Sequence, residues 1–326
     1  MSQPPPDALI ARLREASRLL LTSHTNPDGD AIGTELGLAR LLEGLGKSAT
    51  VWNRDPAPAP FAALAGAERI HVGEVTPPGF PERFDAVVFL ECPSPDRCGL
   101  EDQLSALPAI NLDHHLGNQL YGVVNWVDTA APAVGEMVFR LAEAMRLPID
   151  ETTADLLHLA LVSDTGSFRY SNATPEAFES AARMVRTGAS PERVARTLYD
   201  QRPLASLKLL AEVTSALSLS AQGAVATAVL SRAMFERAGA GKGDSEGLID
   251  TLRSLAGVEA VALLREIGDR ELKVSLRSRG RIDVEAIARR RGGGGHRNAA
   301  GCTVSGDAEA LRAELAAELA AVLDSE

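Results

Sequence analysis

The sequence predicts an α/β protein built from two domains, and three observations support this fold class. The chain has 326 residues, a length that corresponds to about two domains of roughly 100–200 residues each. Its first half alternates short apolar runs with longer helical patterns, which is typical of a parallel sheet covered by helices. Its second half changes to paired strands with flanking helices, which predicts a smaller α/β domain.

The first half contains the runs that predict the parallel sheet. Several runs are apolar at consecutive positions, as expected for strands that are buried on both faces. The predicted strands cover residues 19–23, 50–53, 86–91, 109–112 and 123–127. Helical patterns cover residues 31–45, 134–145 and 152–162. We therefore expect an open α/β sheet with helices on both of its faces.

A long helical stretch then leads into the second domain. Helical patterns cover residues 175–186 and 191–217, after which strands are expected at 224–230, 258–267 and 271–277. Residues 268–269 have the composition of a hairpin turn between the last two strands. Further helices are expected at 246–255, 283–291 and 307–323. These patterns predict a first domain at 1–188, a helical linker at 189–212 and a second domain at 213–326.

Composition excludes several classes of protein. Hydrophobic residues make up 45% of the chain and charged residues 24%, which is the profile of a folded globular protein rather than a disordered one. No apolar run approaches the roughly 20 residues of a membrane span. The N-terminus has no basic-then-apolar signal, so we expect a cytoplasmic protein without a membrane partner. The net charge of -11 argues against nonspecific binding to long DNA.

The charge is unevenly distributed along the sequence. Residues 270–297 contain nine basic and three acidic side chains, although the whole chain is acidic. A local basic pocket on an acidic protein favours a small substrate that is rich in phosphate.

The densest cluster of chemically active residues follows the first predicted strand. His24, Asp28 and Asp30 come directly after residues 19–23, in a segment that Pro27 and Gly29 turn sharply. The carboxyl ends of strands are where open α/β sheets bind ligands. One aspartate is enough to cap the helix that follows, and two carboxylates so close together favour a bound cation. The cluster therefore predicts a metal site.

The ends of other predicted strands and helices repeat this theme. Glu91 ends the strand at 86–91, Asp113, His114 and His115 follow the strand at 109–112, and Asp164 follows the helix at 152–162. Together with the first cluster, these residues provide enough ligands for two divalent ions. Mixed imidazole and carboxylate ligands favour Mn²⁺ or a similar transition metal, and two-metal sites are suited to phosphoryl hydrolysis.

Three of these motifs resemble those of the DHH phosphoesterase superfamily. They are His24-x-x-x-Asp28-x-Asp30, the Asp-His-His triplet at 113–115 and Asp-Thr-Gly at 164–166. The run Gly-Gly-Gly-Gly-His-Arg-Asn-Ala-Ala-Gly at 292–301 is similar to the substrate-binding signature of the DHHA1 domain. The resemblance is closest to the stand-alone nanoRNase and 3′-phosphoadenosine-5′-phosphate (pAp) phosphatase group. It implies an N-terminal DHH domain, a C-terminal DHHA1 domain and an active-site cleft between them.

The resemblance also implies a division of roles among the site residues. One metal would be held by His24, Asp28 and the acid at position 91. The second metal would be held by the same bridging acid and by Asp30, His114 and Asp164. His115 would act beside the scissile phosphate, with Asp113 as the second catalytic residue. The expected cofactors are two Mn²⁺ ions, for which Mg²⁺ or Co²⁺ could substitute.

One residue departs from the family pattern. The superfamily usually has aspartate where this chain has Glu91. Glutamate places its carboxylate one carbon farther from the backbone, so it reaches two metals only with a bent side chain or a retracted strand end. Because Pro93 restricts the residue before it, we expect the backbone near residue 91 to be shifted.

The glycine run predicts a site for a substrate phosphate. Glycines allow positive φ angles and a close approach of the backbone, so amide N–H groups can point at an anion. Basic residues and a Ser-x-Arg-Ser segment lie nearby in the sequence. The predicted substrate-binding residues are Arg277, Ser278, Gly293, Gly294, Gly295, His296 and Arg297.

These features predict an enzyme that hydrolyses short RNA or DNA oligonucleotides, dinucleotides and pAp. Three alternatives stay open, namely a RecJ-like exonuclease, a family II pyrophosphatase and a nucleotide sensor without turnover. The family II pyrophosphatase alternative has less support, because the Ser-Arg-Lys-Lys-Gln signature of that family is absent from this sequence. The sequence leaves open the preference for RNA or DNA, and whether the protein forms a homodimer.

Overall fold

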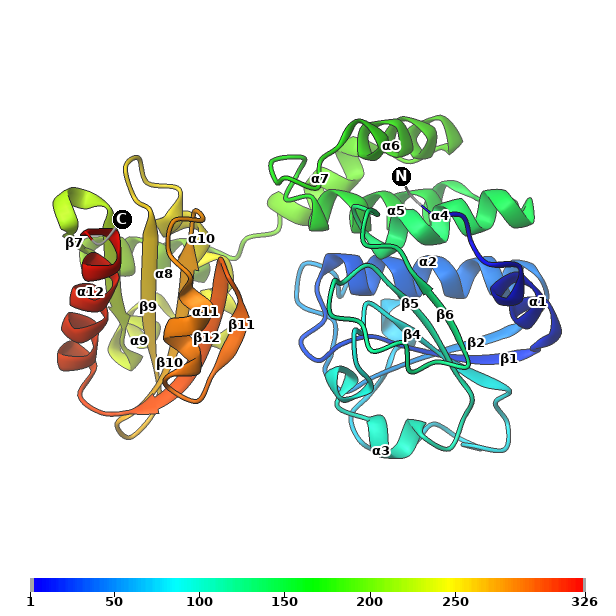
Figure 1. Cartoon of the computed structure of the whole chain (residues 1–326), viewed down its shortest axis with the longest axis horizontal. Coiled ribbons are helices and arrows are strands. Elements are labelled where there is room, and N and C mark those ends of the chain that lie inside the picture. The colour runs from blue at the N-terminus through cyan, green and yellow to red at the C-terminus, as the bar shows by residue number, and fades with distance from the viewer. Residues whose placement is uncertain (1–2, 325–326) are drawn as a thin grey trace. The chain divides into compact units, whose positions relative to one another are not determined.

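Figure 1 shows a computed structural model of the chain, in which residues 3–324 are described. The chain forms two compact units, of which the first extends to Gln201 and the second begins at Arg202. No helix among residues 3–324 combines the length and apolar composition needed to cross a membrane.

The N-terminal unit contains a six-stranded sheet in which all neighbouring strands are parallel. Its strand order is β3-β2-β1-β4-β5-β6. The strands are β1 (Arg18–Thr22), β2 (Ser48–Asn53), β3 (His71–Val72), β4 (Ala86–Leu90), β5 (Ala109–Asp113) and β6 (Val124–Val127). The predicted α/β class with a parallel N-terminal sheet is therefore confirmed.

The register of the central strands brings their carboxyl ends to one edge of the sheet. Thr22 at the end of β1 pairs with Phe89 in β4, and Leu90 at the end of β4 pairs with Leu112 in β5. The residues that follow β1 and β4, and the last residue of β5, consequently lie along the same edge.

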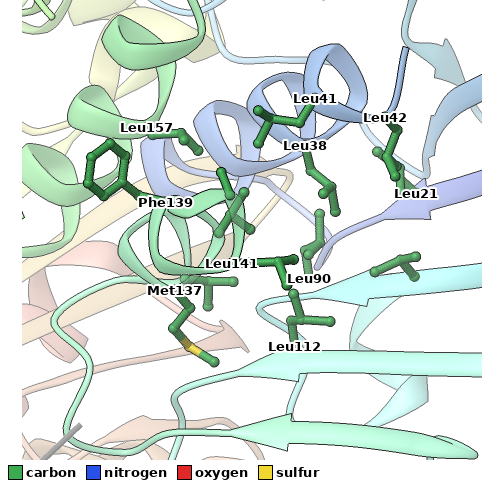
Figure 2. Packing of buried hydrophobic residues seen from close by; sticks show 14 of the residues in the cluster. Leu21, Leu38, Leu41, Leu42, Leu90, Leu112, Met137, Phe139, Leu141 and Leu157 are labelled. Atoms are coloured by element: carbon green, nitrogen blue, oxygen red, sulfur yellow. The ribbon is translucent and has the colours of Figure 1, made fainter. Parts of the chain in front are cut away.

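Helices cover one face of this sheet in layers and enclose the main core. The helices next to the sheet are α1 (Asp7–Glu15), α2 (Gly29–Gly44) and α4 (Val134–Met145). The helix α5 (Glu151–Asp164) packs on α2 and α4, and α6 (Pro175–Thr187) and α7 (Pro191–Tyr199) pack on α5. Figure 2 shows Leu38 of α2 and Leu141 of α4 directed toward Leu90 and Leu112 of the sheet. Side chains of this size each contribute about 1.5–3 kcal/mol when they are fully buried.

The second face of the sheet is covered differently from the expectation. Leu20, Val87 and Phe89 pack there against Leu100 and Leu104, which belong to the short helix α3 (Glu101–Leu104) and the residue before it. Long helices therefore cover one face, and α3 with neighbouring loop segments covers the other.

Close packing of α2 against α5 depends on a glycine. A Cβ atom at Gly33 would lie 2.5 Å from the carbonyl oxygen of Leu156. Only the absence of a side chain lets the two helices approach this closely. The contact fixes α2, and with it the residues at its N-terminus, relative to the end of α5.

A buried acid of α2 gives a prediction for stability. Burial raises the pKa of Glu35 to about 7, although a hydrogen bond from Asn53 Nδ2 at 2.8 Å opposes this shift. Because the unfolded chain releases this proton near pH 4.5, native stability falls as the pH rises from about 4.5 to 7. We expect Glu35→Gln to stabilise the metal-free protein by about 3 kcal/mol at pH 8 and by less than about 1 kcal/mol at pH 5.

Urea unfolding at the two pH values measures this difference. Glu82→Gln serves as the control because Glu82 is exposed. An equal effect of Glu35→Gln at pH 5 and pH 8 would show that Glu35 is ionised throughout this range.

The C-terminal unit has a six-stranded mixed sheet with the order β11-β12-β10-β9-β8-β7. The pair β8–β9 is parallel and the other neighbouring pairs are antiparallel. The strands are β7 (Ser218–Ser220), β8 (Val225–Leu230), β9 (Ala260–Gly268), β10 (Glu271–Ser278), β11 (Gly294–His296) and β12 (Ala299–Ser305). The predicted smaller α/β domain is confirmed.

Two helical layers cover the two faces of this mixed sheet. Leu209, Leu248 and Leu252 pack on one face, from the helices α8 (Leu204–Ser215) and α10 (Leu248–Arg253). Ile287 and Leu315 pack on the other face, from the helices α11 (Val284–Arg289) and α12 (Ala308–Asp324).

Several elements, among them α1, β7 and β11, were not expected from the sequence, and two further differences have a clear physical reason. The helix expected at 191–217 is divided into α7 and α8, and Pro203 immediately precedes α8. Proline disfavours helix at the residue before it and supplies no N–H, so it stops one helix and starts the next. No strand was expected at β12, whose first residues are small; pairing with β10 and β11 makes it a strand.

Candidate metal centre

The edge of the parallel sheet gathers the predicted residues of the N-terminal unit. His24 follows β1, Glu91 follows β4 and Asp113 is the last residue of β5. The N-terminus of α2 adds Asp28 and Asp30 to the same group of acidic side chains. Strand register and helix position therefore bring together residues that are far apart in the sequence.

Asp28 and Asp30 have different structural partners. Asp28 is the N-cap of α2, and its Oδ1 accepts a hydrogen bond of 3.0 Å from the amide of Ala31. Asp30 is fully buried and accepts hydrogen bonds of 2.7 and 2.9 Å from the amides of Val134 and Gly135. Asp30 thereby stabilises the first turn of α4, where no side-chain cap is present.

The histidines at the site are held in a common manner. Nδ1 of His24 lies 2.9 Å from the carbonyl oxygen of Thr25, and Nδ1 of His114 lies 3.0 Å from that of Ala131. A carbonyl can only accept, so each Nδ1 donates, and each Nε2 of the neutral imidazole presents a lone pair. Such backbone contacts are the usual way in which proteins orient a histidine toward a metal.

Three overlapping groups of ligand atoms lie at this edge, and within each group the atoms are within 4.8 Å of one another. One group is formed by His24, Asp28 and Glu91, and another by Asp30, His114 and Asp164. The third group joins Glu91 to His114 and His115. Glu91 therefore belongs to the first group and is linked to the second through His114.

The carboxylates of these groups have histidines as their cationic neighbours within the described residues. Among residues 3–324, no lysine or arginine forms an ion pair with Asp30, Glu91 or Asp164. Burial, followed by repulsion from neighbouring aspartates, raises the pKa of Glu91 well above its usual range. The same causes raise the pKa of Asp164 to about 7 and also raise that of Asp30.

Glu91 is the residue with the clearest need for a ligand. Its side chain is 3% exposed, and among the described residues Oε2 has no hydrogen-bond donor. Nε2 of His24 lies 3.7 Å from this oxygen, and Nε2 of His114 lies 3.9 Å from Oε1. A buried carboxylate without a donor is costly, so the donor set fits divalent cations.

The backbone at Glu91 has an unusual conformation. Its φ angle is +59°, in the left-handed region that residues with a side chain rarely adopt. The amide of Glu91 still bonds to the carbonyl of Leu112 at 3.0 Å, so the strand leaves the sheet abruptly at this residue. The strand end is thus sharply bent at the residue where a shifted backbone was expected.

His115 and Asp113 form a hydrogen-bonded pair beside the ligand groups. Nδ1 of His115 donates to Oδ1 of Asp113 at 2.7 Å, and Asn118 donates to Oδ2 at 2.6 Å. Burial alone would raise the pKa of Asp113, but the hydrogen bond and charge of His115 lower it below its usual value. Asp113 is therefore an anion that orients His115.

Sequence reasoning missed two asparagines at this site. Nδ2 of Asn172 donates to Oδ2 of Asp164 at 3.1 Å and to the carbonyl of Pro132 at 3.0 Å. Asn118 orients Asp113 as described above. Each lies in a loop close to a recognised motif, and that proximity is the one signal that could have identified them.

The predicted substrate residues of the C-terminal unit have distinct surroundings. Arg277 is partly exposed on β10, and its Nε lies 3.4 Å from Oδ1 of Asp250. Ser278 is 1% exposed, and its hydroxyl donates to the carbonyl of Ile282 at 2.7 Å. Ser278 therefore supports the turn before α11, whereas the guanidinium of Arg277 is accessible to a ligand.

The glycine run forms a strand rather than a free loop. Gly294 and Gly295 belong to β11, which pairs with β12 and is the edge strand of the sheet. A Cβ at Gly293 would lie 2.1 Å from the carbonyl oxygen of Gly301, so no side chain fits there. Arg297 is exposed, and the side chain of His296 lies outside the described part of the structure.

Much of the basic charge in residues 270–297 is compensated locally. Arg289 pairs with Glu285, while Arg290 and Arg291 pair with acidic residues of α12. The excess positive charge of the sequence segment is therefore smaller in the folded unit than composition indicates.

Comparison with known proteins identifies the family. The family model for the "DHH family, N-terminal domain" matches residues 18–161, and the "DHHA1 domain" model matches residues 222–323. The chain belongs to the DHH/DHHA1 phosphoesterase family. The resemblance of its sequence motifs to this family is thus confirmed.

Relatives of this DHH/DHHA1 protein align over most of its length. A Thermus thermophilus protein named "Bifunctional oligoribonuclease and PAP phosphatase NrnA" is 32% identical, covering 91% of this chain and 88% of the relative. A Bacillus subtilis protein of the same name is 25% identical, with coverages of 91% and 92%. The crystal structure of an exopolyphosphatase-related protein from Bacteroides fragilis has a TM-score of 0.90 at 26% identity, covering 98% of this chain and 97% of that one.

Proposed function

We propose that the protein is a manganese-dependent phosphoesterase that hydrolyses short oligonucleotides to mononucleotides and pAp to AMP. The observation that carries this proposal is the buried carboxylate of Glu91, which links two groups of ligand atoms and whose Oε2 has no hydrogen-bond partner among the described residues. The names of the two NrnA relatives support the class of substrate.

In this proposal, each group of ligand atoms holds one metal ion. His24, Asp28 and Glu91 hold the first ion, and Asp30, His114 and Asp164 hold the second with Glu91 as the shared ligand. Two such ions supply Lewis acidity and lower the pKa of bound water, which creates a nucleophile near neutral pH.

The protein's own residues contribute proton transfer and positioning. His115, whose Nδ1 donates to Asp113, carries a proton on Nε2 when it is charged and donates that proton to the leaving oxygen. The anionic Asp113 stabilises the imidazolium and fixes the plane of its ring. Asn118 in turn fixes the carboxylate of Asp113.

The C-terminal unit provides recognition of the rest of the nucleotide. Arg277 and Arg297 supply cationic donors, and β11 is the edge strand of the sheet, so one of its sides has no neighbouring strand. We assign Gly294, Gly295 and His296 to the same phosphate contact. The amide of Gly293 donates to the carbonyl of Ala288 at 3.0 Å, so Gly293 and Ser278 are supporting residues. A phosphate held by charged donors is bound through hydrogen bonds worth about 1.5–3 kcal/mol each.

Hydrolysis of a dinucleotide and of pAp by the whole protein tests this function. We expect turnover of both substrates with Mn²⁺, complete loss in excess EDTA, and recovery when Mn²⁺ is restored. Equal rates on strands of tens of nucleotides would favour a RecJ-like exonuclease. Turnover of pyrophosphate alone would favour a pyrophosphatase, and binding without turnover would favour a sensor.

The proposed role of Arg277 gives a separate prediction. Arg277→Ala should raise KM for pAp and for dinucleotides by about 10–100-fold, with an unchanged metal content. Bis-(p-nitrophenyl) phosphate lacks a second nucleotide and should be affected much less. Arg270→Ala removes an equal charge at the turn before β10 and serves as the control. Equal losses on both substrates would place Arg277 in the chemical step instead.

A further inference from the structure

A second cationic pocket lies within the C-terminal unit, away from the glycine run. Its volume is about 590 Å³, within the usual range for small-molecule sites. Four cationic side chains line it against two acidic ones, and the apolar side chains of Phe235 and Ile267 complete its wall. The cationic residues are Arg232, Lys242, Arg265 and Lys273.

Three of these cations converge without acidic partners. Lys273 of β10 is the cross-strand neighbour of Arg265 in β9, and Lys242 begins the 3-10 helix η4 (Lys242–Ser245). Nη1 of Arg265 donates to Ser245 Oγ at 2.7 Å and to the Lys242 carbonyl at 3.4 Å. Among residues 3–324, none of the three forms an ion pair within 4.0 Å.

The charges of this cluster repel one another, and Glu246 offsets this repulsion only in part. Burial, followed by the charges of Arg265 and Lys242, lowers the pKa of Lys273. Burial also lowers the pKa of Arg265, and the carboxylate of Glu246 offsets this only in part. The acidic Glu266 accepts a hydrogen bond from the amide of Arg232, so it is already engaged.

The pocket lies on the same sheet face as Arg277. Lys273, Ser275 and Arg277 alternate with buried residues along β10, so their side chains point to one face. Four residues of strand separate Lys273 from Arg277 by about 13 Å. A stacked strand of nucleic acid advances about 3.4 Å per nucleotide, so this distance corresponds to roughly four nucleotides.

The surface between the two positions is lined on the β12 side by small residues. The β12 residues opposite Arg277, Ser275 and Lys273 are Ala299, Gly301 and Thr303. All three are small and at least partly exposed. A polynucleotide backbone can therefore follow β10 and β12 from one cationic position to the other.

We propose that the pocket formed by Lys242, Arg265 and Lys273 is a distal subsite that binds the far phosphate of an oligonucleotide whose near end lies at Arg277. The inference rests on the proposed function for the placement of that near end. A dinucleotide or pAp is too short to reach the distal subsite, whereas a strand of about five nucleotides spans the distance. Phe235 and Ile267 offer an apolar surface to the terminal base.

Calorimetric titration of the whole protein in EDTA tests this subsite without any turnover. The ligands are oligoadenylates of two and five nucleotides and free AMP, and the variant is Lys242→Ala/Lys273→Ala. We expect Kd for the pentanucleotide to rise about tenfold and that for the dinucleotide to change less than twofold. The slope of log Kd against log salt for the pentanucleotide should fall by about one unit.

The control variant Arg186→Ala/Lys208→Ala removes two exposed cations outside the pocket and should bind both oligonucleotides like the wild type. An unchanged Kd for the pentanucleotide, or equal weakening for both lengths, overturns the proposal. So does a wild-type protein that binds the two lengths equally. Loss of AMP binding with an unchanged pentanucleotide Kd would overturn it in favour of a site for a free nucleotide.

The binding experiment is independent of the proposed catalytic activity. A protein that binds the pentanucleotide through the distal subsite but hydrolyses no oligonucleotide would refute the proposed function and retain the subsite.

Discussion

Replacing Glu91 with alanine is expected to reduce hydrolysis of a dinucleotide by more than about 100-fold. Even residues that only orient a metal ligand contribute about 10–100-fold, and Glu91 links two groups of ligand atoms. Metal analysis of the purified variant should show fewer than two bound ions. Glu91→Asp should retain metal and lose part of the activity, because the shorter side chain leaves a gap.

The same substitution should have the opposite effect on metal-free stability. Glu91 is buried among acidic side chains that repel it, so Glu91→Ala should raise the unfolding temperature in EDTA. Wild-type activity with two bound metals in Glu91→Ala would show that residue 91 is not the shared ligand. If Glu91→Ala fails to fold, Glu91→Gln replaces it in this test, because glutamine keeps the size of the side chain and removes its charge.

Replacing His115 with glutamine should lower kcat by about 10²–10⁴-fold, the usual contribution of a general acid. Metal content should be unchanged, because the proposed ligand sets do not need His115. A leaving group such as p-nitrophenolate needs little protonation, so the loss should be much smaller on a p-nitrophenyl ester than on a dinucleotide.

Variants of Asp113 and Asn118, which orient His115, are compared with His115→Gln. Asp113→Asn should retain the shape of the site and lose the charge that stabilises protonated His115, while Asn118→Ala should have a smaller effect of about 10–100-fold. Equal losses on activated and unactivated substrates would contradict the role of His115 as the proton donor.

The parts of the fold that could be predicted from sequence are those fixed by local pattern. Continuous apolar runs identify β1, β4 and β5, and the acidic and histidine residues at their ends identify the site. The strand β12 could not be predicted because its small residues favour no particular structure. Its conformation comes from pairing with β10 and β11, which is a tertiary effect.

The residues that support the site through hydrogen bonds and ion pairs could not be predicted from the sequence. Asparagine is common in loops, so nothing in the sequence distinguishes Asn118 or Asn172 from ordinary turn residues. The ion pairs of Arg290 and Arg291 depend on the packing of α12 against the same unit. Asp28 proved to be the helix cap as well as a candidate ligand, so Asp28→Asn tests its metal role better than alanine does.

The number of Mn²⁺ ions bound per chain, measured together with the rate of dinucleotide hydrolysis, tests the two-metal proposal most directly. The chain should bind two ions, and activity should appear only as the second site fills. Glu91→Ala should weaken both sites, whereas His115→Gln should leave both intact. Full activity in excess EDTA, or saturation of activity with fewer than two ions per chain, would contradict the two-metal site.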